Sequence, residues 1–174
     1  MTASGARDLR PLRVAVLTVS DTRDEVTDKS GAVLVERLRE AGHVLAEKAI
    51  VRDDVYAIRA IVSRWIAEPL VEVVVTTGGT GLTGRDGTPE AVVVLLDKVI
   101  DGFGELFRAV SYEEIGASSF QSRCVAGVAN GTYIFCLPGS SGACATGWDK
   151  LIGPQLDSRT RPCNLAELIP RLKE

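Results

Sequence analysis

Hydrophobic residues gather in four runs of seven to nine residues along the chain. Runs of this length, bounded by turn-forming residues, favour strands over helices. The run at 12–20 is nearly continuous and rich in valine, a pattern typical of a strand that is covered on both faces of a parallel sheet. We therefore expect strands at 12–20, 43–51, 71–77 and 132–138.

Between these runs, apolar residues recur at helical spacing. The pattern is clear after Asp54, where they fall every three or four positions until Pro69 ends it. Gly42 suits the C-terminal end of the helix before it, and Thr88-Pro89 suits a helix start, with an N-cap followed by proline. We expect helices at 28–42, 54–68, 89–99 and 102–116, and a loop that becomes a helix within 139–156.

Two segments are less clear from their pattern. Residues 118–131 are ambiguous between structures, and a short helix followed by a turn at Asn130-Gly131 is one interpretation. Residues 164–172 form either a short terminal helix or a tail. The alternation of strands and helices predicts an α/β fold in three layers, α/β/α, with a mostly parallel central sheet.

The 174 residues suit a single domain, which we place at 12–174 after a flexible leader at 1–11. A net charge of −3, with scattered basic residues, argues against nucleic-acid binding. The polar N-terminus lacks a signal peptide, and no apolar stretch is long enough to span a membrane. A cytoplasmic protein is the expectation.

Metal-binding thiol chemistry is not indicated. The four cysteines form no C-x-x-C pair, and His43 is the only histidine, so a zinc site is disfavoured and buried free thiols are expected. Cys136 lies in an apolar run and should pack as a small hydrophobic residue. His43 begins its strand, so we expect it on the surface, at the opposite end from any site at the strand C-termini.

In an open parallel sheet, ligands bind at the carboxyl ends of the strands. Four strand ends carry hydroxyls, glycines or carboxylates, and should meet at one edge: Ser20-Asp21, Asp53-Asp54, 76–86 and 138–140. This convergence is the strongest functional signal that the residues give without reference to any known family.

The glycine-rich segment 78–86 resembles two phosphate-binding motifs without fulfilling either. Residues 79–84 match G-x-G-x-x-G, but the helix begins several residues too late for a nicotinamide-dinucleotide fingerprint. A P-loop would need lysine and serine or threonine where Arg85 and Asp86 stand. What remains is a loop in which glycine amides, with the hydroxyls of Thr77 and Thr80, face an anion.

Asp86 is unusual beside an anion site, because a carboxylate repels phosphate unless a cation lies between them. Mg²⁺ is commonly held by one or two carboxylates together with substrate phosphates, and Asp53 is placed to supply the second carboxylate. Simpler roles remain open: Asp86 bonding a turn amide, Asp53 or Asp54 capping the next helix, and Asp21 serving in a turn.

Taken together, these residues resemble a known family. "TTGGTG", followed by Arg85-Asp86 and "TPEA", is similar to the molybdopterin-binding proteins of molybdenum cofactor biosynthesis, which include the bacterial adenylyltransferase and the gephyrin G domain. The resemblance extends through "SDTRDEVTDKSG", "DGFGELFR", "SRCVAGV" and "LPGS". "SYEEIG" and "QLDSRTRPCN" resemble the bacterial branch called protein B.

The resemblance implies a molybdopterin-binding fold, in which active members use Mg-ATP to adenylylate the terminal phosphate of molybdopterin and release pyrophosphate. It implies catalytic and Mg²⁺-binding roles for Asp53 and Asp86, and a homo-oligomer, either a trimer or a hexamer of paired trimers. It also implies a substrate-binding set of Ser20, Asp21, Thr77, Gly78, Gly79, Thr80, Gly81, Ser122, Pro138, Gly139 and Ser140.

One position departs from the family pattern: Gly87 stands where active members usually carry valine. Some members of the protein B branch bind or assemble without adenylyl transfer, and in at least some of them the Arg-Asp pair is altered, whereas Arg85-Asp86 is intact here. A molybdopterin-binding or scaffold protein of the same pathway is therefore the alternative.

Overall fold

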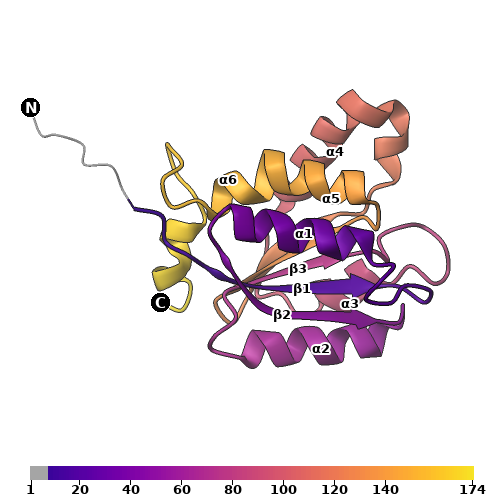
Figure 1. The fold of residues 1–174 in the computed structure, drawn as a ribbon, viewed down its shortest axis with the longest axis horizontal. Helices are drawn as coiled ribbons and strands as arrows, with labels where there is room; N and C mark the ends of the chain where they lie inside the picture. Colours follow the sequence, from indigo (N-terminus) through magenta and orange to yellow (C-terminus); the bar gives the residue numbers. More distant parts are fainter. Residues whose placement is uncertain (1–7) are drawn as a thin grey trace, which may run out of the picture.

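A six-stranded sheet forms the centre of the computed structural model, which describes residues 8–174 (Figure 1). The strand order is β2-β1-β3-β6-β5-β4; the first four strands are parallel, and β5 pairs antiparallel with both β6 and β4. The strands are β1 Arg13–Val19, β2 Val44–Val51, β3 Val73–Thr77, β4 Lys98–Val99, β5 Val125–Ala129 and β6 Thr132–Leu137.

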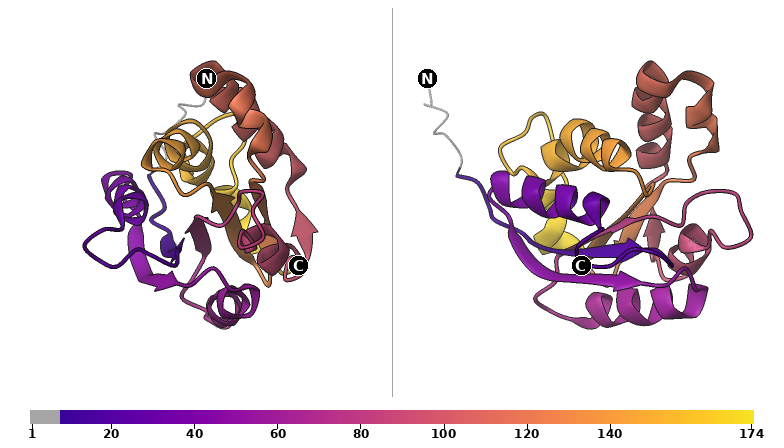
Figure 2. Two further views of the ribbon diagram at one scale, coloured as in Figure 1. Left: turned by 90° about the vertical axis from the view of Figure 1, so that its right-hand side faces the viewer. Right: turned by 45° about the vertical axis from the view of Figure 1, so that its right-hand side comes forward.

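Helices cover both faces of the sheet, as Figures 1 and 2 show. Side chains alternate between the faces, so Val14 and Val16 of β1 join one core and Ala15 and Leu17 join the other. The first core includes α1, α4, α5 and α6, and the second includes α2 and α3. The helices are α1 Lys29–Glu40, α2 Val55–Ala67, α3 Thr88–Val93, α4 Asp101–Ile115, α5 Ser141–Gly147 and α6 Gly153–Leu156.

Three further helical segments are not α-helical. These are 3-10 helices at Gly116–Gln121 and Ala166–Arg171, and a π-helical stretch at Trp148–Ile152. The expected α/β/α fold with a mostly parallel sheet is confirmed. The choice left open for residues 164–172 resolves as the second 3-10 helix.

Polar side chains fix the starts of three helices that follow strands. Asp28 caps α1 by accepting from the Gly31 amide, Asp54 caps α2, and Ser140 caps α5. Asp28 is buried and also accepts from Thr18 Oγ1 at 2.8 Å. Each cap sets where its helix begins after the preceding strand. The caps therefore hold the strand-to-helix loops in place at the carboxyl edge of the sheet.

The helix expected at 89–99 is wrong over its second half. Here α3 ends at Val93, and Lys98–Val99 form β4, a short edge strand beside β5. The stretch from Ala91 to Leu96 is apolar at every position, so it lacks the polar face that a surface helix needs. In a continuous apolar run of this length, the spacing of hydrophobic residues does not distinguish a helix from another structure.

Residues 118–131 contain the strand β5, which the pattern did not reveal. The 3-10 helix at Gly116–Gln121 precedes it, and the expected turn at Asn130-Gly131 is confirmed, with φ of 48° and 79°. Two consecutive left-handed residues suit a tight hairpin, here joining β5 to β6. Gly127 is required because a Cβ there would collide with the Lys98 carbonyl of β4.

The expectation that His43 lies on the surface is wrong. His43 is 5% exposed, its Nδ1 accepts from the Leu12 amide at 3.1 Å, and its ring meets Trp148 edge-on at 6.2 Å. Helical structure after α5 covers the start of β2, which a strand pattern alone does not show. The residue does lie at the opposite end of β2 from Asp53, as expected.

Part of the expected leader at 1–11 lies outside the described residues. Within the described part, the Arg10 amide donates to Ser158 Oγ at 2.9 Å and its guanidinium pairs with Glu72 at 2.8 Å. Through these contacts, the described residues before β1 are joined to Glu72, just before β3, and to Ser158 near the C-terminus.

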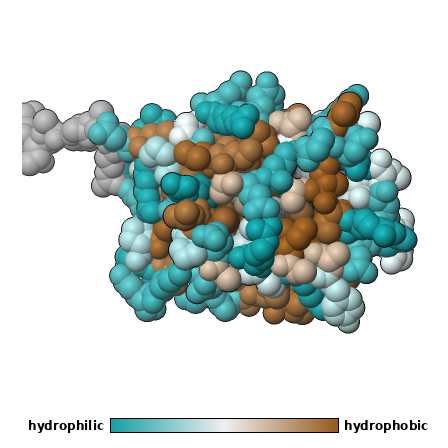
Figure 3. Space-filling view, turned by 60° about the horizontal axis from the view of Figure 1, so that its bottom comes forward, coloured by the Kyte–Doolittle hydropathy of each residue, from teal (hydrophilic) through white to brown (hydrophobic). Residues whose placement is uncertain are grey.

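Hydrophobic and hydrophilic residues are both present on the surface. On the face in Figure 3, hydrophobic side chains form separate patches among hydrophilic ones. Within residues 8–174, no helix is long and apolar enough to cross a membrane.

Candidate active site

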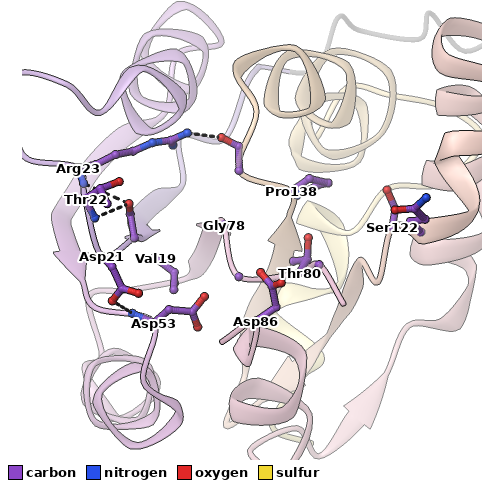
Figure 4. Close-up of a pocket in the computed structure, with 15 residues that line it drawn as sticks. Val19, Asp21, Thr22, Arg23, Asp53, Gly78, Thr80, Asp86, Ser122 and Pro138 are labelled. Atoms are coloured by element: carbon purple, nitrogen blue, oxygen red, sulfur yellow. Dashed lines mark hydrogen bonds between the residues drawn. The ribbon is translucent and has the colours of Figure 1, made fainter. Parts of the chain in front are cut away.

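The carboxyl ends of β1, β2, β3 and β6 open into one cleft of about 560 Å³ (Figure 4). The loops after these strands supply most of its lining, and Gln121 and Ser122, just before β5, supply the rest. Of the residues expected at the site, those that line the cleft are Ser20, Asp21, Asp53, Gly78, Gly79, Thr80, Gly81, Asp86, Ser122, Pro138 and Gly139.

Thr77 and Ser140 are placed differently from the other expected residues. Thr77 is buried, and its hydroxyl donates to the Pro138 carbonyl at 2.9 Å. Ser140 caps α5 by accepting from the Ala143 amide at 3.1 Å. Both residues shape the rim of the cleft without lining it.

The glycine-rich loop crosses directly over the end of β1. Gly78 and Gly79 have φ of 99° and 66°, and a Cβ would collide with the Val19 carbonyl at Gly78 and with Thr88 Oγ1 at Gly79. Only glycine combines this conformation with this close approach. The loop therefore presents bare backbone to the cleft.

Not every amide of this loop is free to meet an anion. The Gly78 amide donates to the Leu137 carbonyl at 3.0 Å, and the Gly81 amide lies against the Asp86 carboxylate, where it helps to lower the pKa of that group. Among the four residues from Gly78 to Gly81, the amides of Gly79 and Thr80 have no such acceptor in the described part of the chain. Fewer amides are therefore available to an anion than the expected span from Gly78 to Gly81.

Asp53 and Asp86 direct their carboxylates into the same space of the cleft (Figure 4). Asp53 Oδ1 accepts from the Gly87 amide at 3.3 Å, so residues far apart in the sequence are joined across the site. Asp54, not Asp53, caps α2. Burial raises the pKa of Asp53 above its ordinary value; the charges of Asp86 and Asp21 act in the same direction, while the Gly87 hydrogen bond opposes them.

Asp86 is held in its own turn. Its Oδ2 accepts from Thr83 Oγ1 at 2.6 Å and from the Thr83 amide at 2.8 Å. These hydrogen bonds lower the pKa of Asp86 and favour the carboxylate form. Asp86 therefore bonds a turn amide, as the simpler interpretation expected, and it also lines the cleft.

Arg85 provides a positive charge near Asp53, which acts to lower the pKa of that carboxyl. It pairs with Asp21 Oδ2 at 2.6 Å while its side chain stays 66% exposed, and Asp21 Oδ1 also accepts from the Asp53 amide. The pair links the glycine-rich loop to the β1–α1 loop. Among residues 8–174, no cationic side chain bonds the carboxylate of Asp53 or that of Asp86.

The arrangement fits a divalent cation only with help from a ligand. Two carboxylates beside free backbone amides provide hard oxygen donors, which Mg²⁺ prefers. No cluster of three or more His, Cys, Asp or Glu side chains suited to a metal occurs in residues 8–174. A cation at Asp53 and Asp86 would therefore need further oxygens, such as those of a phosphate chain.

Two arginines at the cleft escaped the sequence analysis, although both lie in segments that carried the family resemblance. Arg23 lines the cleft and donates to the Gly139 carbonyl at 2.8 Å and to Ser30 Oγ at 2.6 Å, joining the β1–α1 and β6–α5 loops. Arg123 follows Ser122 and donates to the Gly81 carbonyl at 2.9 Å. The carbonyls that these arginines bond, those of Gly139 and Gly81, are distant in sequence, so no spacing rule could reveal the contacts.

Known proteins resemble this chain over most of its length. The family described as "Probable molybdopterin binding domain" matches residues 15–158. Molybdenum cofactor biosynthesis protein B of Escherichia coli (strain K12) is 56% identical over 164 residues, which cover 94% of this chain and 95% of the relative. The Bacillus cereus protein of the same name is 49% identical over 148 residues, covering 84% and 88%.

Solved structures give the same result. A crystal structure of molybdenum cofactor biosynthesis protein B superposes with a TM-score of 0.87 at 44% identity, covering 95% of this chain and 98% of the other. The tungsten cofactor synthesizing protein MoaB from Pyrococcus furiosus superposes with a TM-score of 0.78 at 34% identity, covering 95% and 99%. The chain therefore belongs to the molybdopterin-binding domain family that contains molybdenum cofactor biosynthesis protein B.

Proposed function

We propose that this protein acts in molybdenum cofactor biosynthesis, where it binds molybdopterin and uses Mg-ATP to adenylylate the terminal phosphate. The observation that carries the proposal is the shared cleft in which Asp53, Asp86 and the glycine-rich loop meet. Family membership and the names of the relatives support the pathway.

Adenylyl transfer suits a cleft without a histidine. An oxygen of the molybdopterin phosphate attacks the α-phosphorus of ATP, the bond from that phosphorus to the bridging oxygen breaks, and pyrophosphate leaves. A phosphate monoester with a second pKa of about 6 is mostly ionised at pH 7, so the attack requires no general base. His43, the only histidine, lies at the far end of β2.

The residues of the cleft then act by positioning and charge. The amides of Gly79 and Thr80 would donate to a phosphate oxygen, and Asp53 and Asp86 would hold Mg²⁺. When bound, Mg²⁺ offsets the negative charge that accumulates on the phosphates. Arg85, exposed beside Asp53, provides a further contact for the phosphate chain.

The departure at Gly87 does not leave the site open. A Cβ at this position would lie 2.7 Å from Val55 Cγ2, so Val55 already fills the space that a valine at 87 would occupy. The Gly87 amide keeps its bond to Asp53. With that space filled and the Asp53 contact kept, glycine at position 87 is compatible with an active cleft.

The test is incubation of the protein with molybdopterin and ATP labelled at the α-phosphate, with and without Mg²⁺. The proposal expects labelled AMP-molybdopterin in the presence of Mg²⁺. Tight binding of molybdopterin with no transfer of label would instead support the alternative, a binding or scaffold protein of the pathway. This alternative is favoured by the absence, among residues 8–174, of a third His, Cys, Asp or Glu side chain that could complete a metal site with Asp53 and Asp86.

A trimer or hexamer is proposed as the working form. Large apolar side chains are exposed on α4 and the 3-10 helix after it, where a subunit contact would cover them: Leu106, Tyr112, Ile115 and Phe120. Light scattering coupled to size-exclusion chromatography distinguishes these states from a monomer of 18.6 kDa.

A further inference from the structure

The loop that carries Asp86 is closed by one side chain from another part of the chain. Arg123 donates through Nε to the Gly81 carbonyl at 2.9 Å and through Nη2 to the Asp86 carbonyl at 3.1 Å. These two carbonyls are the ends of the segment 81–86. The guanidinium therefore holds the loop ends together, much as a hydrogen-bond ladder closes a hairpin.

A carboxylate outside the loop fixes the guanidinium in turn. Glu90, in the first turn of α3, pairs with Arg123 through Nη1 and accepts from Nη2 at 3.4 Å. The bond from Arg123 lowers the pKa of Glu90. Arg59 of α2 donates to the Glu90 carbonyl at 3.0 Å, which anchors this part of α3 to its neighbour.

Closure of the loop determines where the Asp86 carboxylate points. The groups that bond it are the hydroxyl and amide of Thr83 and the amide of Gly81, all within the segment whose ends Arg123 joins. Arg123 also follows Ser122, which lines the opposite wall of the cleft. One side chain thus links the wall at Ser122 to the loop that bears Asp86.

We propose that Arg123, held by Glu90, is a positioning residue that fixes the Asp86 carboxylate for Mg-ATP by clamping the loop at Gly81 and Asp86. This inference rests on the proposed function for its kinetic consequence, but not for its structural one. Arginine is required because a planar guanidinium donates in several fixed directions at once, whereas a lysine ammonium on a flexible stem does not.

The first test compares Arg123→Lys with wild type by amide hydrogen exchange and by kinetics. We expect the Thr83 and Asp86 amides, which bond within the loop, to exchange about tenfold faster in the variant, with β3 unchanged. Loss of a partner that orients a metal ligand typically costs about 10- to 100-fold. We therefore expect kcat to fall by that factor and half-maximal activity to need more Mg²⁺, with KM for molybdopterin within about threefold.

Arg64→Lys is the matched control, because Arg64 also makes a two-bond pair with a carboxylate, Glu47, at a site away from the cleft. It should leave loop exchange and kinetics within about twofold of wild type. Glu90→Gln provides a second route, since it keeps Arg123 but removes its charged partner. It should change the same quantities in the same direction, and adding it to Arg123→Lys should cost little more than the single change.

Unchanged exchange at Thr83 and Asp86 in both Arg123→Lys and Glu90→Gln would overturn the clamp. A loss of activity in which KM for molybdopterin rises while the Mg²⁺ requirement stays constant would also overturn it. If wild type forms no AMP-molybdopterin, the proposed function fails, yet the clamp is still tested by loop exchange and by binding of Mn²⁺-ATP. Mn²⁺-ATP should bind about tenfold more weakly to Arg123→Lys, and equal binding would count against the clamp.

Discussion

Replacing Gly81 by alanine tests whether the position of the Asp86 carboxylate controls the reaction. A Cβ at Gly81 would lie 2.7 Å from Asp86 Oδ2, whereas ordinary contact begins at 3.4 Å. The carboxylate must therefore move by about 0.7 Å, away from the orientation that Thr83 gives it. A misplacement near 1 Å can cost about 100-fold in rate, so we expect kcat to fall about 10- to 100-fold, or about 1.4–2.7 kcal/mol of activation free energy.

The assay is formation of AMP-molybdopterin at saturating substrates, with molybdopterin affinity measured separately by fluorescence. Gly84→Ala is a matched control in the same loop, because a Cβ there meets nothing within 4 Å. It should keep kcat within about twofold, since surface changes of this kind have small effects. A Gly81→Ala variant that retains kcat within threefold of wild type would refute this prediction, as would a Gly84→Ala variant whose kcat falls as far as that of Gly81→Ala.

Three further predictions concern charge and burial. Asp53→Asn keeps an acceptor for the Gly87 amide and removes a crowded charge, so transfer should fall about 100- to 1,000-fold while the unfolding temperature at pH 7 is no lower than that of wild type; a clear fall in that temperature would contradict this. Burial lowers the pKa of His43, so the unfolded chain binds a proton at this imidazole more readily than the folded chain does. The contribution of the neutral imidazole to stability is therefore complete above pH 6.5 and is lost as the pH falls below 6.5. An NMR titration of this single histidine with a midpoint at or above 6.5 would refute the prediction. Cys163 is the exposed thiol, so Ellman's reagent should modify one thiol quickly and the other three only after unfolding, with rapid reaction of two or more in the native protein as the contrary result.

The hydrophobic pattern of the sequence was sufficient to predict the parallel strands of the sheet. The valine-rich run before Ser20 and the run before Gly78 are buried on both faces, so their strands could be read from composition and length alone. The rule that ligands bind at the carboxyl ends of parallel strands then brought Asp53 and Asp86 to one cleft. These inferences depend on local sequence and on one general property of sheets.

The antiparallel edge and the arginine contacts depend on long-range packing instead. Small residues such as Gly127 give β5 little strand character, and its place follows from its pairing with β4 and β6. Arg123 contacts residues more than thirty positions away, and His43 is buried by the segment around Trp148. No periodicity or motif spacing encodes such contacts, so they could be found only in three dimensions.

Pyrophosphate release is the most direct test of the claim that two aspartates and a glycine-rich loop form an adenylyl-transfer site. With molybdopterin and Mg-ATP, wild type should release one pyrophosphate for each AMP-molybdopterin formed, and the Asp53→Asn, Asp86→Asn double variant should release none above background. Binding of both substrates by wild type without pyrophosphate release would contradict the account. So would release by the double variant within threefold of the wild-type rate.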